Sequence, residues 1–210
     1  MFIFRKLTVK VRMMKLPGTF YLSNDVCDVA RSLLGKVLFT KVSGLITAGI
    51  IVETEAYSYR EKACHAYSGR RTKRTETLFL EGSTAYVYLC YGRYYLFNVV
   101  TNEKEIAEAV LIRALEPWKS IDIMLERRKM TGNHYSITSG PGKLSIAMGI
   151  DESFNRQPLT GDVVWIEDRG ILVPFTEIVE TKRVGVDYAG KDAELPWRYY
   201  IKGNKWVSRQ

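Results

Sequence analysis

Hydrophobic and polar residues recur with a helical period in only a few segments of the chain. Residues 23–35 have apolar side chains at every third or fourth position, so they predict a helix that Ser23 or Asn24 can cap and Gly35 can end. The same spacing predicts two further helices, over residues 117–130 and 141–149.

Most of the remaining apolar segments alternate with period two or are rich in β-branched and aromatic residues, which is typical of strands. The first two flank a Val-Ser-Gly turn and predict a hairpin, and Tyr91-Gly92-Arg93 predicts a tight turn between two others. The predicted strands are residues 36–41, 45–54, 84–91, 94–101, 109–115, 163–167, 172–179 and 197–201. Since no repeat or low-complexity linker divides the chain, we expect one α+β domain over residues 17–210, preceded by a basic tail over residues 1–16.

The composition excludes several classes of protein. The 210 residues are 46% hydrophobic and 26% charged, which excludes wholesale disorder and collagen-like or coiled-coil designs. No run approaches the roughly 18 to 20 apolar residues of a membrane span, and the start lacks the apolar block of a secretory signal. We therefore expect an intracellular protein with no membrane contact. The acid-free start is also compatible with a targeting segment.

Positive charge is concentrated in three segments. The chain has 31 Lys and Arg against 23 Asp and Glu, a net charge of +8, and the excess lies in residues 1–24, 60–76 and 127–129. Such clusters suit a polyanionic partner, because Lys and Arg displace counterions from phosphates. A solvated basic surface without such a partner accounts for the charge equally well.

The cysteines and histidines predict neither a disulfide framework nor a metal site. Cys27, Cys64 and Cys90 are widely spaced and never form a Cys-x-x-Cys pair. The two histidines, His65 and His134, have no metal-ligand spacing. We expect plain thiols and no metal.

Three polar side chains share one face of a predicted strand. Alternation places Glu53, Glu55 and Tyr57 on that face, with the two carboxylates roughly 7 Å apart. Carboxylates near that separation can hydrolyse a glycosidic bond, one of them activating a water. The alternative is a solvent-facing strand end in which salt bridges satisfy both acids.

Two further polar residues fall on strand faces that are otherwise apolar. Arg113 shares a face with Leu111 and Leu115, so it should be partly buried and must find a carboxylate or a phosphate. Asn98 has a similar position in the strand over residues 94–101, and a buried amide must be hydrogen-bonded. Each residue can serve a site or simply satisfy the core.

Aromatic residues occur near a polar, basic loop predicted over residues 69–74. Tyr86 and Tyr88 share a strand face, and Tyr91 opens the turn beyond them. Tyr57 and His65 lie shortly before the loop. Stacked rings bind nucleobases with about 1 to 3 kcal/mol per base, and they attract a cationic base further. Strand tyrosines also simply pack, so the rings alone do not identify a site.

Several fragments occur in order along the chain with the spacing of one enzyme family. They are Val52-Glu-Thr-Glu-Ala-Tyr57, His65, Ala85-Tyr-Val-Tyr-Leu-Cys-Tyr-Gly92, Asn98, Leu111-Ile-Arg-Ala-Leu-Glu-Pro117 and Ser139-Gly-Pro-Gly-Lys-Leu144. Together they resemble the alkyladenine (3-methyladenine) DNA glycosylase family, over residues 22–206. The resemblance implies a single domain with a curved, mainly antiparallel β-sheet and surrounding α-helices. It also implies a protein that flips a damaged purine out of duplex DNA and hydrolyses its N-glycosidic bond, leaving an abasic site.

The resemblance also implies how the bond is hydrolysed. Glu55 matches the general base that activates the attacking water, and Arg113 and the main-chain carbonyl of Val184 match groups that position this water. Glu53 has no counterpart in catalysis, so the hypothesis of paired carboxylates reduces to one base and one structural acid. No lysine is placed at the chemistry, and strand cleavage through a Schiff base needs an amine. We therefore expect no lyase activity, and neither a metal nor an organic cofactor.

The same resemblance assigns residues to the flipped base. Tyr57, His65 and Tyr88 match the rings that sandwich it, and Asn98 matches the pocket amide that disfavours the exocyclic amine of guanine. Tyr91 resembles the wedge that fills the space vacated in the duplex. The implied lesions are 3-methyladenine, 7-methylguanine, hypoxanthine and ethenoadenine. An alkylated purine is cationic and suits an electron-rich cage, so we expect neutral hypoxanthine to react more slowly.

Four cations are candidates for contacts with the DNA backbone: Arg93, Arg70, Arg71 and Lys73. Arg93 follows the wedge turn where relatives often carry Met, so a phosphate contact there replaces part of the apolar wedge.

We expect a monomer, because no apolar docking stripe is evident. The alternative function is a non-catalytic module with the same fold that binds damaged DNA or structured RNA.

Overall fold

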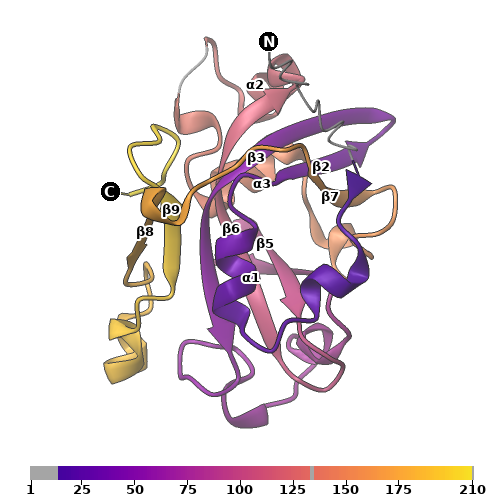
Figure 1. Cartoon of the computed structure of the whole chain (residues 1–210). Coiled ribbons are helices and arrows are strands. Elements are labelled where there is room, and N and C mark those ends of the chain that lie inside the picture. Colours follow the sequence, from indigo (N-terminus) through magenta and orange to yellow (C-terminus); the bar gives the residue numbers. More distant parts are fainter. Residues whose placement is uncertain (1–13, 133–134, 210) are drawn as a thin grey trace, which may run out of the picture.

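The strands of the computed structural model, which describes residues 14–132 and 135–209, join one curled antiparallel sheet (Figure 1). Within these residues the strand order is β1-β7-β2-β3-β6-β5-β4, and β9 pairs with both β3 and β8. The strands are β1 (Met14–Lys15), β2 (Val37–Val42), β3 (Leu45–Ser58), β4 (Ala85–Cys90), β5 (Tyr94–Thr101), β6 (Glu108–Lys119), β7 (Val164–Asp168), β8 (Ile178–Thr181) and β9 (Arg198–Ile201). The expected α+β class with a curved, mainly antiparallel sheet is confirmed.

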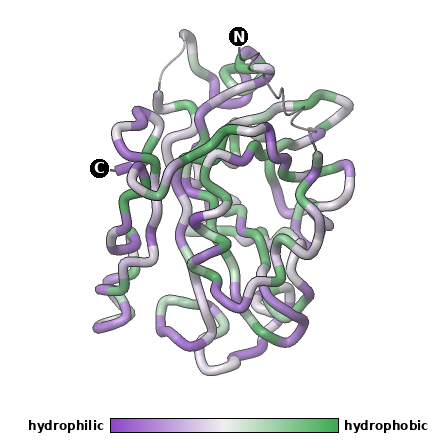
Figure 2. The backbone as a smooth tube through the Cα atoms, viewed as in Figure 1, coloured by the Kyte–Doolittle hydropathy of each residue, from purple (hydrophilic) through white to green (hydrophobic). Residues whose placement is uncertain are grey.

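Helices pack against this sheet and enclose the hydrophobic core. The α-helices in the described part of the chain are α1 (Val26–Ser32), α2 (Ile121–Arg128) and α3 (Pro141–Met148), and short 3-10 helices occur in the loops. Helix α1 contacts β3 and β6, α3 contacts β5 and β6, and α2 packs on α3. Hydrophobic segments run through the interior strands, and hydrophilic segments form many of the outer loops (Figure 2). None of the described helices has the length and apolar character needed to cross a membrane.

The two faces of the central strands differ, because side chains alternate along each strand. On β6, Val110 and Ile112 belong to the hydrophobic core, whereas Arg113 lines a cavity on the other face. Arg113 contacts both Glu53 and Glu55 of β3. The prediction that these two carboxylates share a face is therefore confirmed, and that face is the one opposite the core.

Backbone with positive φ closes both predicted hairpins. Ser43 (φ 50°) and Gly44 (φ 81°) join β2 to β3, and Tyr91 (φ 50°) and Gly92 (φ 65°) join β4 to β5. Two successive residues with positive φ are typical of the type I′ turn, whose twist matches that of the strands. A tyrosine is uncommon in this backbone region, so the turn holds Tyr91 at the tip of its hairpin against the preference of the residue.

Two predictions of local structure are wrong. Residues 117–119 continue β6 instead of starting a helix, and α2 begins only after Ser120, which has a φ of 56°. Of the strand predicted over residues 172–179, only the last two residues are in a strand, because β8 begins at Ile178. Pro174 has no N–H to donate to a sheet ladder, which accounts for the missing part.

The start of the chain also differs from expectation. Asp25, rather than Ser23 or Asn24, caps α1, and its carboxylate accepts an N–H of the first turn at 2.8 Å. At the end of the basic segment over residues 1–16, Met14–Lys15 form β1, which pairs with β7, and Leu16 donates its N–H to the carbonyl of Ile166 at 2.8 Å. Residues 1–13 lie outside the described residues.

Candidate active site

Strand pairing places residues from distant parts of the sequence in one row across the sheet. Tyr86 of β4 is opposite Asn98 of β5, and Asn98 is opposite Leu111 of β6. Leu111 is in turn opposite Glu55 of β3. Opposed side chains on one face have Cβ atoms about 4.5–5.5 Å apart, so the register alone brings aromatic, amide and carboxylate groups together.

Glu55 is fully buried and is held by three donors. Its Oε1 accepts the main-chain N–H of Val184 at 2.7 Å, and its Oε2 accepts the hydroxyl of Tyr57 at 2.7 Å. Nη1 of Arg113 lies 3.2 Å from Oε2. An ionised carboxylate has about four lone-pair positions, so one position on Oε1 has no partner among the described residues. The N–H of Val184 thus serves Glu55, and the water-positioning role of its carbonyl stays a prediction.

Glu53, the second carboxylate, anchors Arg113. Its Oε1 accepts Nε of Arg113 at 3.0 Å and Nε of Arg198 at 2.7 Å, while its Oε2 accepts the N–H of Ser208 at 2.6 Å. Burial lowers the pKa of Arg113, but Glu55 and Glu53 raise it more, so the guanidinium stays charged. The prediction that a buried Arg113 must find a carboxylate or a phosphate is confirmed, and it finds two carboxylates.

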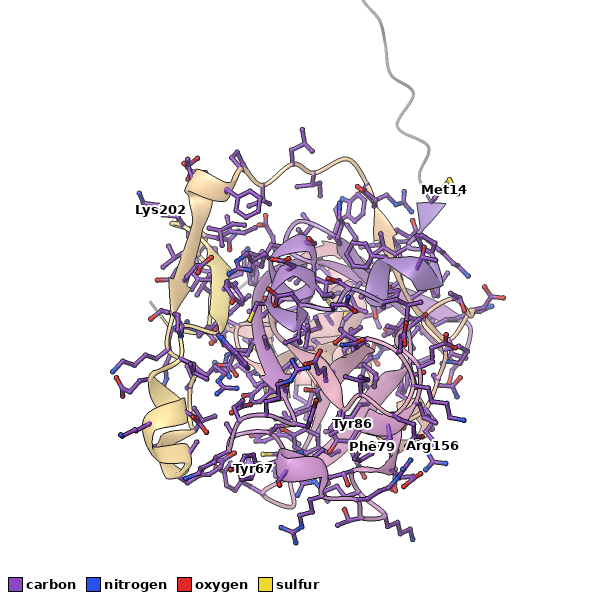
Figure 3. All side chains as sticks on the ribbon, turned by 60° about the horizontal axis from the view of Figure 1, so that its bottom comes forward. Met14, Tyr67, Phe79, Tyr86, Arg156 and Lys202 are labelled. Atoms are coloured by element: carbon purple, nitrogen blue, oxygen red, sulfur yellow. The ribbon has the colours of Figure 1, made fainter. Side chains whose placement is uncertain are left out.

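A cavity of about 630 Å³ opens on this face of the sheet, a size typical of ligand sites. The residues that line it include all three partners of Glu55. Figure 3 turns the bottom of Figure 1 forward and labels Tyr86, one of the lining residues, near Phe79. Both residues belong to a second hydrophobic cluster, which supports the cavity wall. Lining side chains that carry nitrogen or oxygen atoms are Tyr57, His65, Arg74, Tyr86, Tyr88, Tyr91, Tyr94, Asn98, Arg113 and Tyr188.

His65, Tyr86 and Tyr88 form an aromatic cage in the cavity wall. The ring centres of His65 and Tyr88 are 4.6 Å apart, edge to face, and those of Tyr86 and Tyr88 are 5.4 Å apart. Nε2 of His65 lies 3.2 Å from Nη2 of Arg74, and because arginine can only donate, Nε2 is the acceptor. The ring proton is then on Nδ1, which donates to the Tyr86 hydroxyl at 3.0 Å. Burial, and then Arg74, lower the pKa of His65 to about 4, so the ring is neutral at pH 7.

Tyr57 and Asn98 are fixed by contacts at their polar ends. Burial, followed by the charge of Glu55, raises the pKa of Tyr57 well above its usual value, so its hydroxyl keeps the proton that it donates. Asn98 donates through Nδ2 to the carbonyl of Tyr86 at 3.1 Å. The structure thus collects in one cavity wall the predicted site residues Tyr57, His65, Tyr88, Asn98, Arg113 and Val184.

Tyr91 stands at the mouth of the cavity. Its side chain is 94% exposed although it also lines the opening. Arg93, two residues later, is exposed, and its guanidinium carbon lies 5.2 Å from the ring centre of Tyr94. The turn therefore presents a large ring and a cation directly beside the cavity.

The three basic residues predicted to contact DNA in the loop before β4 are not equivalent. Nε of Arg71 lies 3.0 Å from Glu76, and Nη1 lies 2.7 Å from Glu105. Arg70 and Lys73 are exposed and have no ion pair within the described ranges. The protein's own carboxylates hold Arg71, which leaves Arg70 and Lys73 as the available cations.

Two residues at the site, Arg183 and Arg74, could not be identified as site residues from the sequence. Arg183 is buried, its two terminal nitrogens each donate to Glu61 at 2.8 Å, and its guanidinium carbon lies 4.8 Å from the ring centre of Tyr57. Arg74 lines the cavity. Both lie in polar, basic runs that are typical of exposed loops, so only contacts between distant parts of the chain distinguish them.

Known proteins similar to this chain share one activity in their names. Residues 19–205 match the model of the family described as Methylpurine-DNA glycosylase (MPG). Three relatives carry the name "Putative 3-methyladenine DNA glycosylase". That of Clostridium acetobutylicum is 50% identical over 203 residues, covering 93% of this chain and 98% of the relative. Those of Clostridium beijerinckii and Chlamydia felis are 46% and 42% identical over 192 residues each, covering 87% and 90% of this chain and 93% and 97% of the relatives. The chain therefore belongs to the methylpurine-DNA glycosylase family and is a DNA glycosylase, a hydrolase of N-glycosyl bonds.

Proposed function

We propose that this DNA glycosylase removes alkylated and deaminated purines from duplex DNA, and that Glu55 activates the water that hydrolyses the N-glycosidic bond. The proposed substrates are 3-methyladenine, 7-methylguanine, hypoxanthine and ethenoadenine. One observation carries the proposal: the three donors that hold Glu55 all line the cavity that contains the aromatic cage. A base bound in this cavity is therefore next to residues that contact the Glu55 carboxylate directly.

Glu55 acts as the general base in this proposal. The water oxygen bonds to C1′ of the sugar while a water proton passes to Glu55, and the N-glycosidic bond breaks with its electron pair leaving on the purine. Oε1 of Glu55 has a lone-pair position for that proton. Arg113 lies 3.2 Å from the carboxylate as its countercharge, and Tyr57 and Val184 fix its orientation.

The cavity wall suits an electron-poor base. Alkylation at a ring nitrogen makes the purine cationic, which improves the leaving group and increases its attraction to aromatic faces. Because His65 is neutral at pH 7, it adds no repelling charge. Asn98 lies in the same row as Tyr86, where we expect it to exclude the exocyclic amine of guanine. Neutral hypoxanthine lacks the cationic attraction, so we expect slower excision.

The residues of the cavity also support hydrolysis without strand cleavage. None of the described residues that line it is a lysine, whereas a Schiff-base lyase needs an amine beside the sugar.

The surface around the cavity supports binding to duplex DNA. In the proposal, Tyr91 fills the space that the flipped base vacates, since its exposed ring stands beside the cavity on a tight turn. Arg93, Arg70 and Lys73 contact phosphates, because all three are exposed cations. Arg71 contributes less, since two carboxylates already hold it.

A base-excision assay tests the proposal. Labelled duplexes that contain one of the four lesions are incubated with the enzyme in EDTA, and strand breaks are measured before and after alkali. We expect breaks only after alkali, with 7-methylguanine excised faster than hypoxanthine. Binding without excision of any of the four lesions would refute the proposed substrates, and breaks without alkali would refute the absence of lyase activity.

A further inference from the structure

We propose that Arg74 competes with the flipped base: in the DNA-free protein its guanidinium packs against the rings of the aromatic cage, so an incoming base must displace it. The inference rests on the proposed function, because it takes the cage to be the site of the base. The guanidinium carbon of Arg74 lies 4.6 Å from the ring centre of Tyr88. Its Nη2 lies 3.2 Å from Nε2 of His65, and the side chain lines the cavity.

The guanidinium resembles an alkylated purine in the two properties that the cage recognises. It is planar and cationic, and it lies against the face of Tyr88 as a flat cation does in a cation–π contact. It also donates an N–H to His65. A purine that stacks on Tyr88 and approaches His65 requires the same positions, so the base and Arg74 compete.

Arg74 can leave without disturbing the loop that carries it. Within the described residues it has no carboxylate partner, and its contacts are with the rings of the cage. The loop is fixed by other residues: the hydroxyl of Thr75 donates to the carbonyl of Arg70 at 2.9 Å, and Arg71 is paired with Glu76. Displacement therefore costs only the contacts of one side chain.

Competition of this kind changes how completely different bases fill the cage. Occupation of the cage by Arg74 lowers the affinity for every base by the same factor. A base that binds the cage tightly still fills it almost completely, whereas the occupancy of a weakly bound base falls in proportion. The contact thus lowers the occupancy of the cage by undamaged bases more than its occupancy by a lesion that still saturates it, while the ratio of the two affinities is unchanged.

Binding of the free base ethenoadenine, followed by its fluorescence, tests the inference without any contribution from DNA phosphates. The variants are Arg74→Ala, which empties the cage, and Arg74→Gln, which keeps an N–H donor for His65 but removes the charge. Lys104→Ala is the matched control, since it removes one exposed positive charge outside the cavity. We expect Arg74→Ala to bind ethenoadenine about tenfold more tightly than the wild type, from the lost stacking and hydrogen bond. Arg74→Gln should also bind it more tightly, but by a smaller factor, because it loses the stacked cation and keeps the donor. The control should match the wild type.

The possible outcomes separate this inference from the proposed function. Binding that is unchanged or weaker in both Arg74 variants overturns the inference, and so does an equal gain in Lys104→Ala. If the wild type still excises lesions in the assay described above, the proposed function stands while the inference falls. A wild-type protein that neither binds ethenoadenine nor excises any lesion overturns both.

Discussion

Replacing Arg113 by Met tests the electrostatic arrangement that holds Glu55. The change keeps an unbranched apolar stem but removes a charge that is 7% exposed and contacts two fully buried carboxylates, Glu53 at 3.0 Å and Glu55 at 3.2 Å. Glu53 retains its contact with Arg198, so Glu55 is the group that loses its countercharge. Removing one partner of a buried ion pair costs about 3–5 kcal/mol, because the other charge stays buried without compensation.

This loss should be visible in both chemical and thermal unfolding. For a chain of this size, about 2–4 °C of Tm accompany each kcal/mol, so we expect a fall of about 6–20 °C. Urea unfolding followed by circular dichroism gives the free energy of unfolding from the shifted midpoint at an unchanged slope. Arg71→Met is the matched control: Arg71 also contacts two glutamates, but on the exposed surface, where ion pairs contribute little.

A second substitution separates the charge effect from lost packing. Arg113→Met combined with Glu55→Gln removes the uncompensated charge while keeping the shape of the side chain. We expect this double variant to be more stable than Arg113→Met alone. A loss below about 1 kcal/mol in Arg113→Met, which would be typical of an exposed pair, would refute the reasoning, as would a double variant that recovers nothing.

Further predictions follow from the charges and exposure around the cavity. The pKa of His65 is about 4 in the folded protein and about 6.5 in the unfolded chain. Between these two pH values the unfolded chain binds more protons than the folded protein. The free energy of unfolding should therefore fall as the pH drops from 6.5 to 4. An NMR titration of the imidazole with a midpoint near 6.5 would contradict this. Tyr91→Ala should leave stability within about 0.5 kcal/mol, because the ring is exposed, yet weaken binding to damaged duplex more than to undamaged duplex; equal weakening would exclude the wedge role. Arg70→Ala and Lys73→Ala should each lower the slope of log affinity for DNA against log salt concentration by about one phosphate contact. Arg71→Ala should lower this slope by less. Equal effects of all three substitutions would show that the carboxylates do not hold Arg71.

Sequence patterns predict the parts of this site that depend on local geometry. Alternation along one strand is enough to place Glu53 and Glu55 on the same face, and the burial of Arg113 next to a carboxylate follows from its apolar neighbours. The hairpin turn at Tyr91 is predicted by its glycine. These local features do not decide between the two predicted functions, the glycosylase and the non-catalytic binding module. Membership of an enzyme family decides for the glycosylase.

Contacts between distant segments account for what the sequence could not predict. Residues 117–119 pair with β3, and that pairing overrides their helix-like spacing. Charge counting treats Arg71 like its neighbours, because its partner Glu105 is 34 residues away. Arg183 is unremarkable in sequence, since its partner Glu61 comes from the other half of the chain. The positions of these partners are set by the fold.

The rate of base excision by Glu55→Gln tests the central claim most directly. Glutamine keeps the size and the hydrogen-bonding oxygen of the side chain but cannot accept the proton of the water. With excess enzyme on a duplex containing ethenoadenine, we expect the single-turnover rate to fall by about 10²–10⁴-fold, the usual contribution of a general base, while the duplex is still bound nearly as tightly as by the wild type. A variant that excises the base as fast as the wild type would contradict the assignment of Glu55 as the general base.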